Sequence, residues 1–286
     1  MCLIWGTTWL GIKISLATLG PFMGVGLRFV IAGLLLFAVA ALRRELRPVR
    51  EYPWRVIVML AVFLFAINYV LNYVAETRLD SGLVSVLFGT LPFFTFAFGA
   101  LMIGERAMPM VLLGAVIAFA GLAIVSLTPE VRGSIPYALC TLGAAAIAAF
   151  ANVYAKKHSH HPPLVTLPPS MLIAGLLVGI LGLIFERTNW HTAMSPTSIG
   201  AVLYLAILGS SVAFFLMLWL LQRIPVYAVG VATLIFPIIA LAVGALFGGE
   251  IPGLKELVGC ALVIGGLGLA LVKPAATGAE TRSDTA

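Results

Sequence analysis

The second half of this chain repeats the first half at a fixed spacing. A shift of 145 residues carries residues 78–125 onto 223–270 without a gap. The shift superimposes residues that rarely replace one another, namely Arg78 on Arg223, Pro92 on Pro237, Gly104-Glu105 on Gly249-Glu250 and Gly121 on Gly266. Apolar segments resemble one another by composition, but an ungapped coincidence of Pro, Glu and Gly residues indicates a duplication. We therefore expect two related halves.

The composition indicates that both halves lie in a membrane. Of the 286 residues, 62% are hydrophobic and only 10% are charged. A soluble protein of this composition would expose a largely apolar surface to water, and many hydrophobic runs approach the roughly 20 residues that cross a bilayer. The net charge of +6 is not concentrated in a basic domain. We therefore expect the lipid bilayer as a partner, and no nucleic acid.

Ten apolar segments are delimited by charged residues, prolines and polar clusters. They lie at about residues 2–19, 21–42, 54–75, 81–103, 108–127, 135–156, 164–185, 198–222, 226–247 and 254–273. We predict an all-α membrane protein of ten transmembrane helices, with five-helix repeats at residues 1–130 and 131–274 and a polar tail at 275–286. The first segment has no basic residues before it, so we expect no cleaved signal peptide.

The distribution of basic residues predicts the orientation of the bundle. With a cytoplasmic N-terminus, the cytoplasmic connections and the tail hold 11 Lys and Arg residues, and the outer connections hold 4. Because cytoplasmic loops carry the excess of positive charge, we expect both termini in the cytoplasm. Repeats of five helices, an odd number, then enter the membrane from opposite sides. Inverted repeats are typical of secondary transporters; alternatively, the duplication only builds a larger bundle.

Several motifs in this order resemble one family. They are Trp5-Gly6-Thr7 in the first segment, Leu27-Arg28-Phe29 in the second, and the pair Pro92…Gly104-Glu105 and Pro237…Gly249-Glu250. Together with the repeat, they are similar to EamA-type members of the drug/metabolite transporter superfamily. The resemblance implies a ten-helix inverted-repeat transporter of the bacterial inner membrane that exports amino acids or other small metabolites. It also implies a central cavity lined by helices one, three, four, six, eight and nine.

Polar and charged side chains inside a bilayer are costly, so they are the first candidates for function. In the first segment, Trp5, Trp9 and Lys13 follow one another at four-residue steps and share one helix face. Asn152 lies 143 residues after Trp9 and takes its place in the second copy. We expect these residues to line the cavity, with Lys13 as an anchor for a substrate carboxylate. Alternatively, Lys13 extends to the membrane surface and takes no part in binding.

The third segment carries two polar stripes at four-residue spacing, Asn68 with Asn72 and Tyr69 with Tyr73. These side chains form neutral hydrogen bonds, which suit transient binding of a substrate; alternatively, they only join helices within the membrane. Ser85 of the fourth segment and Tyr227 of the ninth belong to helices that the resemblance places around the cavity. We therefore count both among the expected cavity residues.

Arg28 is the second charge inside the membrane. It follows Pro21 by seven residues, about 10 Å along a helix at ~1.5 Å per residue, so it can lie at the depth of Lys13. Two cations in one outer pocket would attract an anionic group. The alternative role for Arg28 is structural, through a bond to Glu76 or Glu250 or to backbone carbonyl groups.

Pro92 and Pro237 occupy equivalent positions inside the fourth and ninth segments. Proline removes one backbone hydrogen bond and kinks a helix, so we expect paired hinges for alternating access, with static bends as the alternative. Glu105 and Glu250 follow these helices, near the N-terminus of the next helix, where the helix dipole favours an anion. We expect them to cap a helix or pair with a basic residue; gating is the alternative.

Motifs of enzymes are missing from the chain. It has no Gly-x-x-x-x-Gly-Lys-[Ser/Thr] loop, no His-Glu-x-x-His and no Gly-x-Ser-x-Gly. We therefore expect no enzyme, no cofactor and no metal site, and a solvated loop at His158, His160 and His161. No acidic residue lies in the middle of a segment, which argues against proton antiport. If transport is coupled to protons, Glu76, Glu105 or Glu250 would serve, or the substrate would carry the charge itself.

These observations predict a multi-pass transporter of the bacterial inner membrane that exports small molecules through a central cavity by alternating access. Amino acids are the first expected substrates, and Trp5, Trp9, Tyr69 and Tyr73 favour aromatic or bulky apolar ones. A multidrug or organic-cation exporter is the alternative, although its cavity would need an acidic residue. A membrane protein that transports nothing is the third hypothesis. We expect a monomer, with a dimer as the alternative.

Overall fold

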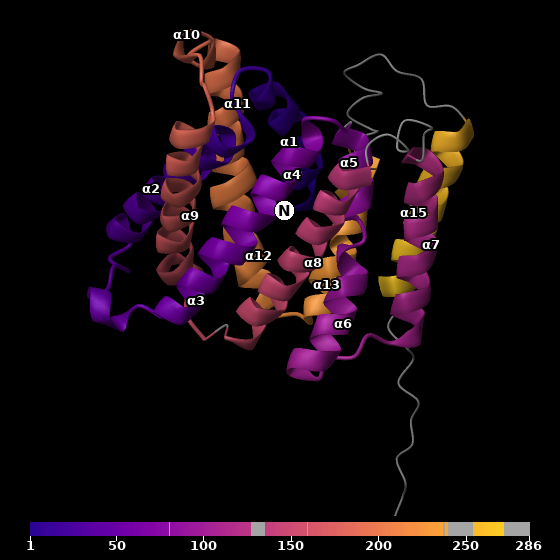
Figure 1. Ribbon diagram of the computed structural model, residues 1–286. Coiled ribbons are helices and arrows are strands. Elements are labelled where there is room, and N and C mark those ends of the chain that lie inside the picture. Colours follow the sequence, from indigo (N-terminus) through magenta and orange to yellow (C-terminus); the bar gives the residue numbers. More distant parts are fainter. Residues whose placement is uncertain (80, 127–134, 159, 237, 240–253, 272–286) are drawn as a thin grey trace, which may run out of the picture.

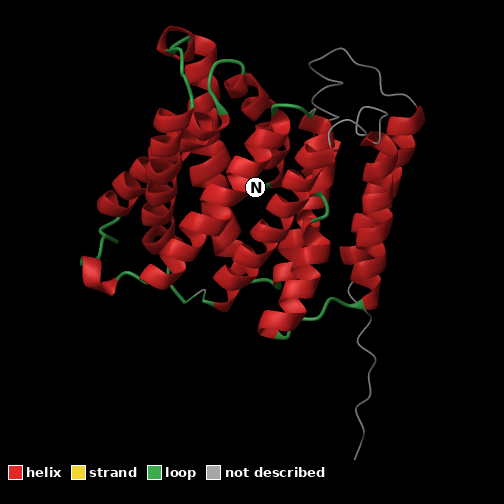
Figure 2. Cartoon of the chain, viewed as in Figure 1, coloured by secondary structure: helices red, strands yellow, loops and turns green. Residues whose placement is uncertain are grey.

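A computed structural model gives the fold for residues 1–79, 81–126, 135–158, 160–236, 238–239 and 254–271. These residues form a bundle of roughly aligned helices (Figure 1). Figure 2 shows that, within the same ranges, helices are joined by short loops and no strand is present. The predicted all-helical architecture is therefore confirmed for the described residues.

The first half contains the helices that correspond to predicted segments one to five. They are α1 (Cys2–Leu16), α2 (Pro21–Leu42), α3 (Trp54–Met59), a π-helical stretch (Leu60–Ile67), α4 (Asn68–Glu76), α5 (Ser81–Phe88), α6 (Leu91–Ile103) and α7 (Pro109–Ser126), with a short 3₁₀ turn at Val49–Glu51. The stretch from α3 to α4 is continuous and forms one span, Trp54–Glu76.

The second half follows the same plan. Its elements are α8 (Ile135–Lys157), α9 (Pro163–Phe185), the short α10 (Trp190–Ala193), α11 (Pro196–Ala206), a π-helical stretch (Ile207–Val212), α12 (Ala213–Leu221), α13 (Val226–Ala232), a 3₁₀ turn (Thr233–Ile235) and α15 (Leu254–Leu271). The predicted ninth segment, 226–247, is described only in its first part. Five of the described helical stretches are long and apolar enough to cross a membrane: Pro21–Leu42, Trp54–Glu76, Ile135–Lys157, Pro163–Phe185 and Pro196–Leu221.

Irregular backbone recurs at equivalent positions of the two halves. The 145-residue shift carries the π-helical stretch Leu60–Ile67 onto 205–212, where the second π-helical stretch lies. It also carries residues 88–90, where α5 ends and a turn precedes α6, onto the 3₁₀ turn Thr233–Ile235. Pro92 lies in the first turn of α6, where its missing N–H costs no helical hydrogen bond. The fourth segment is thus broken rather than merely kinked at this point.

The helices pack in pairs, and the shift between the two halves carries one packed pair onto another or a pair onto itself. The first and eighth segments meet through α1 and α11, and their repeat mates, the sixth and third, meet through α8 and α4. Two further pairs, α2 with α9 and α7 with α15, each join a helix to its own repeat mate, and α6 meets α13, so that the fourth segment meets its repeat mate, the ninth segment. This pattern is the one that a two-fold relation between the halves produces. That the two-fold axis lies in the membrane plane, as an inverted repeat requires, stays a prediction.

Glycines allow α2 and α9 to approach each other closely. A Cβ atom at Gly26 would lie 2.5 Å from the Cα atom of Gly179, and one at Gly175 would lie 2.8 Å from the carbonyl carbon of Phe29. Since real Cβ atoms do not approach backbone atoms so closely, a side chain at either position would force the helices apart. Small residues serve this purpose in membrane helix pairs generally.

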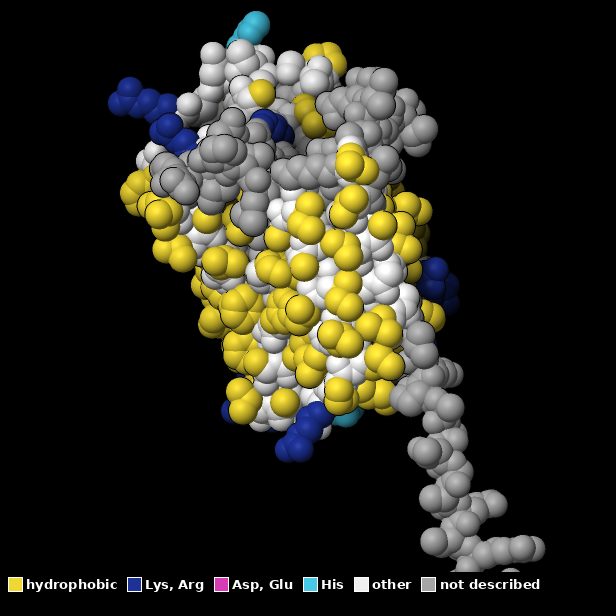
Figure 3. Space-filling view, turned by 90° about the vertical axis from the view of Figure 1, so that its right-hand side faces the viewer, with side chains coloured by type: hydrophobic (Ala, Val, Ile, Leu, Met, Phe, Trp, Pro, Cys, Tyr) yellow, Lys and Arg dark blue, Asp and Glu magenta, His cyan; other side chains and the backbone are white. Residues whose placement is uncertain are grey.

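The outer surface of the bundle is apolar. Figure 3 shows hydrophobic side chains across the face on which α7 and α15 lie, with Lys and Arg side chains at its margins. Leu112, Leu113 and Val116 of α7 and Val258 and Ile264 of α15 are exposed there. A surface of this kind is stable against lipid chains, whereas contiguous apolar patches of this extent are rare on soluble monomers.

The glycine contacts generate a stability prediction. We expect Gly175→Ala to lower the free energy of unfolding by about 1–3 kcal/mol, because overpacking in a close contact costs that much. Gly200→Ala is the matched control, since nothing lies within 4 Å of a Cβ atom there. Thermal denaturation of both variants in detergent tests this prediction. A melting temperature of Gly175→Ala at or above that of Gly200→Ala would contradict it.

Candidate functional site

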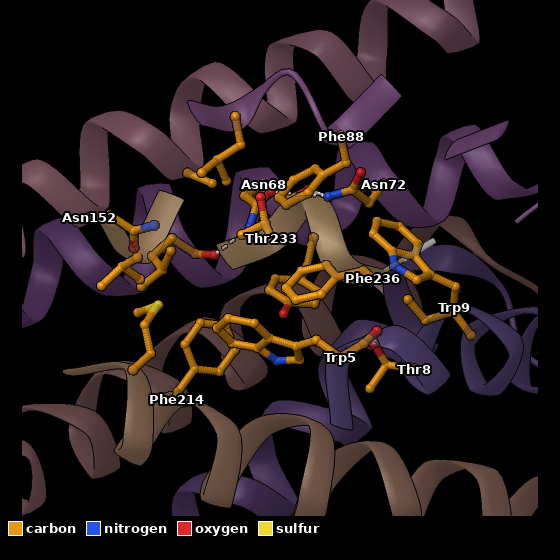
Figure 4. Close-up of a pocket in the computed structure, with 17 residues that line it drawn as sticks. Trp5, Thr8, Trp9, Asn68, Asn72, Phe88, Asn152, Phe214, Thr233 and Phe236 are labelled. Carbon is orange, nitrogen blue, oxygen red and sulfur yellow. Dashed lines mark hydrogen bonds between the residues drawn. The ribbon is translucent and has the colours of Figure 1, made fainter. Parts of the chain in front are cut away.

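A pocket of about 650 Å³ of space free of protein atoms, part of it open to the outside, lies among the helices of both halves. Its lining comes from α1, the α3–α4 span, α5, α6, α8, α12, α13 and the 3₁₀ turn after α13. These belong to segments one, three, four, six, eight and nine, the set that the resemblance implies for a central cavity. Figure 4 shows the side chains that converge on this space.

Aromatic rings form most of the pocket wall, from Trp5, Trp9, Tyr69, Phe88, Phe214 and Phe236. The ring of Trp5 meets the edges of Phe214 and Phe236, with centroids 5.1 and 5.8 Å apart. Trp9 meets Phe88 at 5.7 Å in the same edge-to-face manner. Edge-to-face contacts of this kind stabilise the ring orientations beyond the burial of area, so the wall is preformed.

The polar part of the lining consists of Thr8, Asn68, Asn72, Asn152 and Thr233. The amide of Asn72 donates to the side-chain oxygen of Asn68 at 3.0 Å, and the amide of Asn68 donates to the carbonyl oxygen of Leu64 at 3.0 Å. Among the described lining residues there is no Asp, Glu, Lys, Arg or His. The pocket therefore offers hydrogen bonds and no net charge.

Three buried polar atoms of this lining have no hydrogen-bond partner in the described part of the chain. They are Nε1 of Trp9, Oδ1 of Asn72 and Oδ1 of Asn152, that is, one donor and two acceptors. Most buried polar groups in proteins are hydrogen-bonded, and exceptions call for an explanation. In Figure 4, Trp9 and Asn72 lie toward one end of the pocket and Asn152 toward the other. Trp9, Asn72 and Asn152 all line the pocket, so their side chains are the candidates for polar contact with a bound molecule.

The lining residues form pairs under the internal repeat. Residues that the 145-residue or 143-residue shift superimposes line the pocket together: Trp5 with Ala148, Trp9 with Asn152, Tyr69 with Phe214, Asn72 with Met217, Phe88 with Thr233 and Leu91 with Phe236. The pocket thus lies where the two halves meet. The position of the pocket is therefore symmetric with respect to the repeat. Its chemistry is not, because the two members of every pair are different residues.

Arg28 lies behind the pocket wall rather than in it. Its side chain is 1% exposed, its Nε donates to the hydroxyl of Ser210 at 2.7 Å, and its Nη2 donates to the carbonyl oxygen of Gly209 at 3.1 Å. The same carbonyl accepts a hydrogen bond from Nε1 of Trp5 at 3.0 Å. Gly209 and Ser210 belong to the π-helical stretch Ile207–Val212, and π-helical stretches often lie at functional sites.

The guanidinium of Arg28 also lies over the ring of Tyr69, 4.5 Å from its centroid. Arg28 thus joins the second, third and eighth segments and holds two pocket residues, Trp5 and Tyr69, in place. Of the roles considered from the sequence, a bond to backbone carbonyl groups is the one that the structure contains. Glu250, the other carboxylate considered for Arg28, lies outside the described residues.

Four residues expected in the cavity do not line this pocket. Tyr73 is fully buried and Ser85 is buried. Tyr227 packs against a separate apolar cluster that contains Phe96. The side chain of Lys13 is exposed on α1. The role of Lys13 as a substrate anchor stays a prediction.

The sequence reasoning missed Phe214, Phe236 and Thr233, which all line the pocket. The eighth segment has few polar residues to mark a functional face, and a phenylalanine in an apolar helix is no signal by itself. The internal repeat was the available signal, because it superimposes these residues on Tyr69, Leu91 and Phe88.

Glu105 caps a helix of the other half. Gly104 ends α6 with a φ of 72°, a conformation that favours glycine. The next residue, Glu105, accepts a hydrogen bond from the backbone N–H of Val226 at 2.8 Å, at the start of α13. This contact ties the end of the fourth segment to the start of its repeat mate, the ninth segment. Glu250 and Pro237, the equivalents in the second half, lie outside the described residues.

Comparison with known proteins places the chain in a family. The model of the EamA-like transporter family matches twice, at residues 1–127 and 135–272. A probable amino-acid metabolite efflux pump of Escherichia coli (strain K12) is 30% identical, over 92% of this chain and 90% of that protein. The uncharacterized inner membrane transporter YedA of the same strain is 29% identical, over 87% and 80%.

Further comparisons agree with this assignment. Protein PagO of Salmonella typhimurium is 29% identical over 84% of this chain and 80% of its own length. A solved crystal structure that covers 94% of both chains superimposes with a TM-score of 0.81 at 24% identity, which shows that the fold is shared. The chain therefore belongs to the EamA-like transporter family and is a multi-pass transporter of the inner membrane rather than an enzyme.

Proposed function

We propose that this transporter exports amino acids with aromatic or bulky apolar side chains through the central pocket. The observation that carries this proposal is the combination of an aromatic wall with three unpartnered polar atoms and no charged lining residue among those described. Two relatives are named as probable amino-acid metabolite efflux pumps, at 27% and 30% identity. Their names support the substrate class and leave the individual amino acid open.

A free amino acid matches the polar atoms of the pocket. Its ammonium group donates hydrogen bonds and finds an acceptor in Oδ1 of Asn72. Its carboxylate accepts and finds a donor in Nε1 of Trp9. The side chain then extends along the aromatic wall toward Asn152. Neutral partners hold the zwitterion less tightly than charged ones would, and a transporter must release its substrate on the other side.

The two alternative functions fit the pocket less well. An organic cation would be held best by an acidic side chain in the wall, and the described lining has none. A protein that transports nothing would have a closed core, whereas here the two halves leave a pocket between them. We therefore favour the amino acid over the cation as substrate.

Alternating access uses the irregular backbone around the pocket. In this proposal the halves form an inverted repeat of five helices each, with both termini cytoplasmic. The breaks before Pro92 and in the 3₁₀ turn Thr233–Ile235 interrupt the helices that border the pocket, and interrupted helices are common at transporter sites. Pro92 and Pro237 act as paired hinges, while the contact of Glu105 with α13 closes one end. The functional unit is a monomer.

Counterflow in proteoliposomes tests the substrate class. Vesicles loaded with the twenty amino acids are given each labelled amino acid in turn. We expect exchange of phenylalanine, tryptophan and leucine well above that of aspartate, glutamate or lysine, because the described lining offers no partner for a charged side chain. Exchange of a cationic dye, with no exchange of any amino acid, would support the organic-cation alternative instead.

The indole N–H of Trp9 gives a sharper test. Trp9→Phe keeps an aromatic ring and removes the donor, so we expect the KM for L-phenylalanine to rise about tenfold or more, since a hydrogen bond to a charged group contributes about 1.5–3 kcal/mol. Phenethylamine has no carboxylate, so the concentration at which it inhibits counterflow should stay unchanged. Equal losses for both molecules would show that Trp9 does not bind the carboxylate.

A further inference from the structure

A stripe of polar side chains leads from the pocket along α4 to a buried carboxyl group. Asn68, Asn72 and Glu76 follow one another at four-residue steps and share one face of this helix. The two asparagines line the pocket, and Glu76 is the last residue of α4. Its side chain is only 4% exposed. The stripe therefore leads from the substrate pocket to an acidic group that the sequence placed at the end of a span and the structure places in the interior.

Only one of the two carboxyl oxygens of Glu76 takes part in a hydrogen bond in the described part of the chain. Its Oε2 accepts a hydrogen bond from the hydroxyl of Ser81 at 3.0 Å, and that hydroxyl also lies 3.5 Å from the carbonyl oxygen of Trp9 in the pocket wall. Its Oε1 has no hydrogen-bond partner in the described part of the chain. For a side chain that is only 4% exposed, this is an incomplete arrangement for a permanent carboxylate.

The other carboxyl groups near helix ends are held differently. Both oxygens of Glu186 accept hydrogen bonds from the backbone at the start of α2, from Phe22 at 2.8 Å and from Met23 at 2.9 Å. Glu105 accepts one from Val226 at the start of α13. A helix N-terminus stabilises an anion, so the backbone of a neighbouring helix supports each of these two carboxylates. Glu76 has no such support, because it lies at a helix C-terminus.

Opposing influences act on the charge of Glu76. Burial and the C-terminal end of α4 destabilise an anion there. The positive charges of Lys13 from α1 and Arg28 from α2 stabilise it, as does the hydroxyl of Ser81 from α5, while Tyr73 is the titratable neighbour on α4 itself. Because these influences oppose one another, a modest rearrangement of the helices can tip the group from one form to the other.

We propose that Glu76 is the proton carrier that couples substrate export to the proton gradient. On the outer side the carboxylate takes up one proton from water, and on the cytoplasmic side it returns that proton to water. Protonation removes its attraction to Lys13 and Arg28, so the packing of α4 against α1 and α2 changes beside the pocket. One proton then enters for each cycle in which substrate leaves. This inference rests on the proposed function for its substrate.

The first test compares two kinds of transport by Glu76→Gln. Vesicles with an acidic interior should accumulate labelled L-phenylalanine through the wild type. The variant should fall to the level of protein-free vesicles, yet exchange internal for external L-phenylalanine in counterflow, which moves no net proton. Glu51→Gln, at an exposed residue of the first cytoplasmic loop, should keep both activities. Accumulation by Glu76→Gln, or counterflow without accumulation in the wild type, would overturn the coupling role.

A second test needs no substrate and separates this inference from the proposed function. If the wild type exchanges no amino acid, the proposed function fails, and infrared spectroscopy of the lipid-reconstituted protein still decides the role of Glu76. A carbonyl stretching band of a protonated, buried carboxyl group should disappear reversibly as pH rises. The band should be missing in Glu76→Gln and present in Glu51→Gln. A wild type with no titrating band that Glu76→Gln removes would overturn the proposal.

Discussion

The hydrocarbon of a bilayer supplies no water, so every polar group in it must find its partner within the protein. The carbonyl group of Gly209 shows how this chain meets the requirement. Freed by a π-helical stretch, it accepts hydrogen bonds from both Trp5 and Arg28. One irregular turn of the eighth segment thus binds a buried cation and fixes a pocket residue. Among the described residues, buried polar atoms without a partner remain in the pocket, at Trp9, Asn72 and Asn152, and outside it, at Arg28, Tyr73, Glu76 and Thr188.

Duplication explains where the pocket lies and why its two sides differ in chemistry. The pocket lies where repeat-related residues meet, so its position follows from the relation between the halves. Each related pair has diverged, as in Trp9 with Asn152 or Tyr69 with Phe214. Divergence leaves the hydrogen-bonding atoms distributed unevenly around an aromatic wall. A nearly symmetric frame therefore presents two chemically different sides to the pocket.

Sequence periodicity predicted the helices well and the pocket in part. The structure brings Trp5, Trp9, Asn68, Tyr69, Asn72 and Asn152 together in one pocket, because polar residues in apolar helices are rare enough to stand out. Periodicity identifies which residues share a face, but not which neighbour that face meets. Tyr73 therefore lies one step away from the pocket although its partner Tyr69 lines it. The break before Pro92 and the π-helical stretches have no sequence signature strong enough to locate them, and the stretch Leu60–Ile67 changes the register of the faces that follow it.

We propose that this pocket opens alternately to the two sides of the membrane. Accessibility of one cysteine tests it most directly. Ala148→Cys places a thiol in the lining, in a protein whose Cys2, Cys140 and Cys260 are replaced by Ser, and Ala149→Cys is the matched buried control outside the lining. We expect a membrane-impermeant thiol reagent to label Ala148→Cys from either side, with protection by L-phenylalanine, and to leave Ala149→Cys unlabelled. Labelling of Ala148→Cys from one side only, at every substrate concentration, would contradict the account.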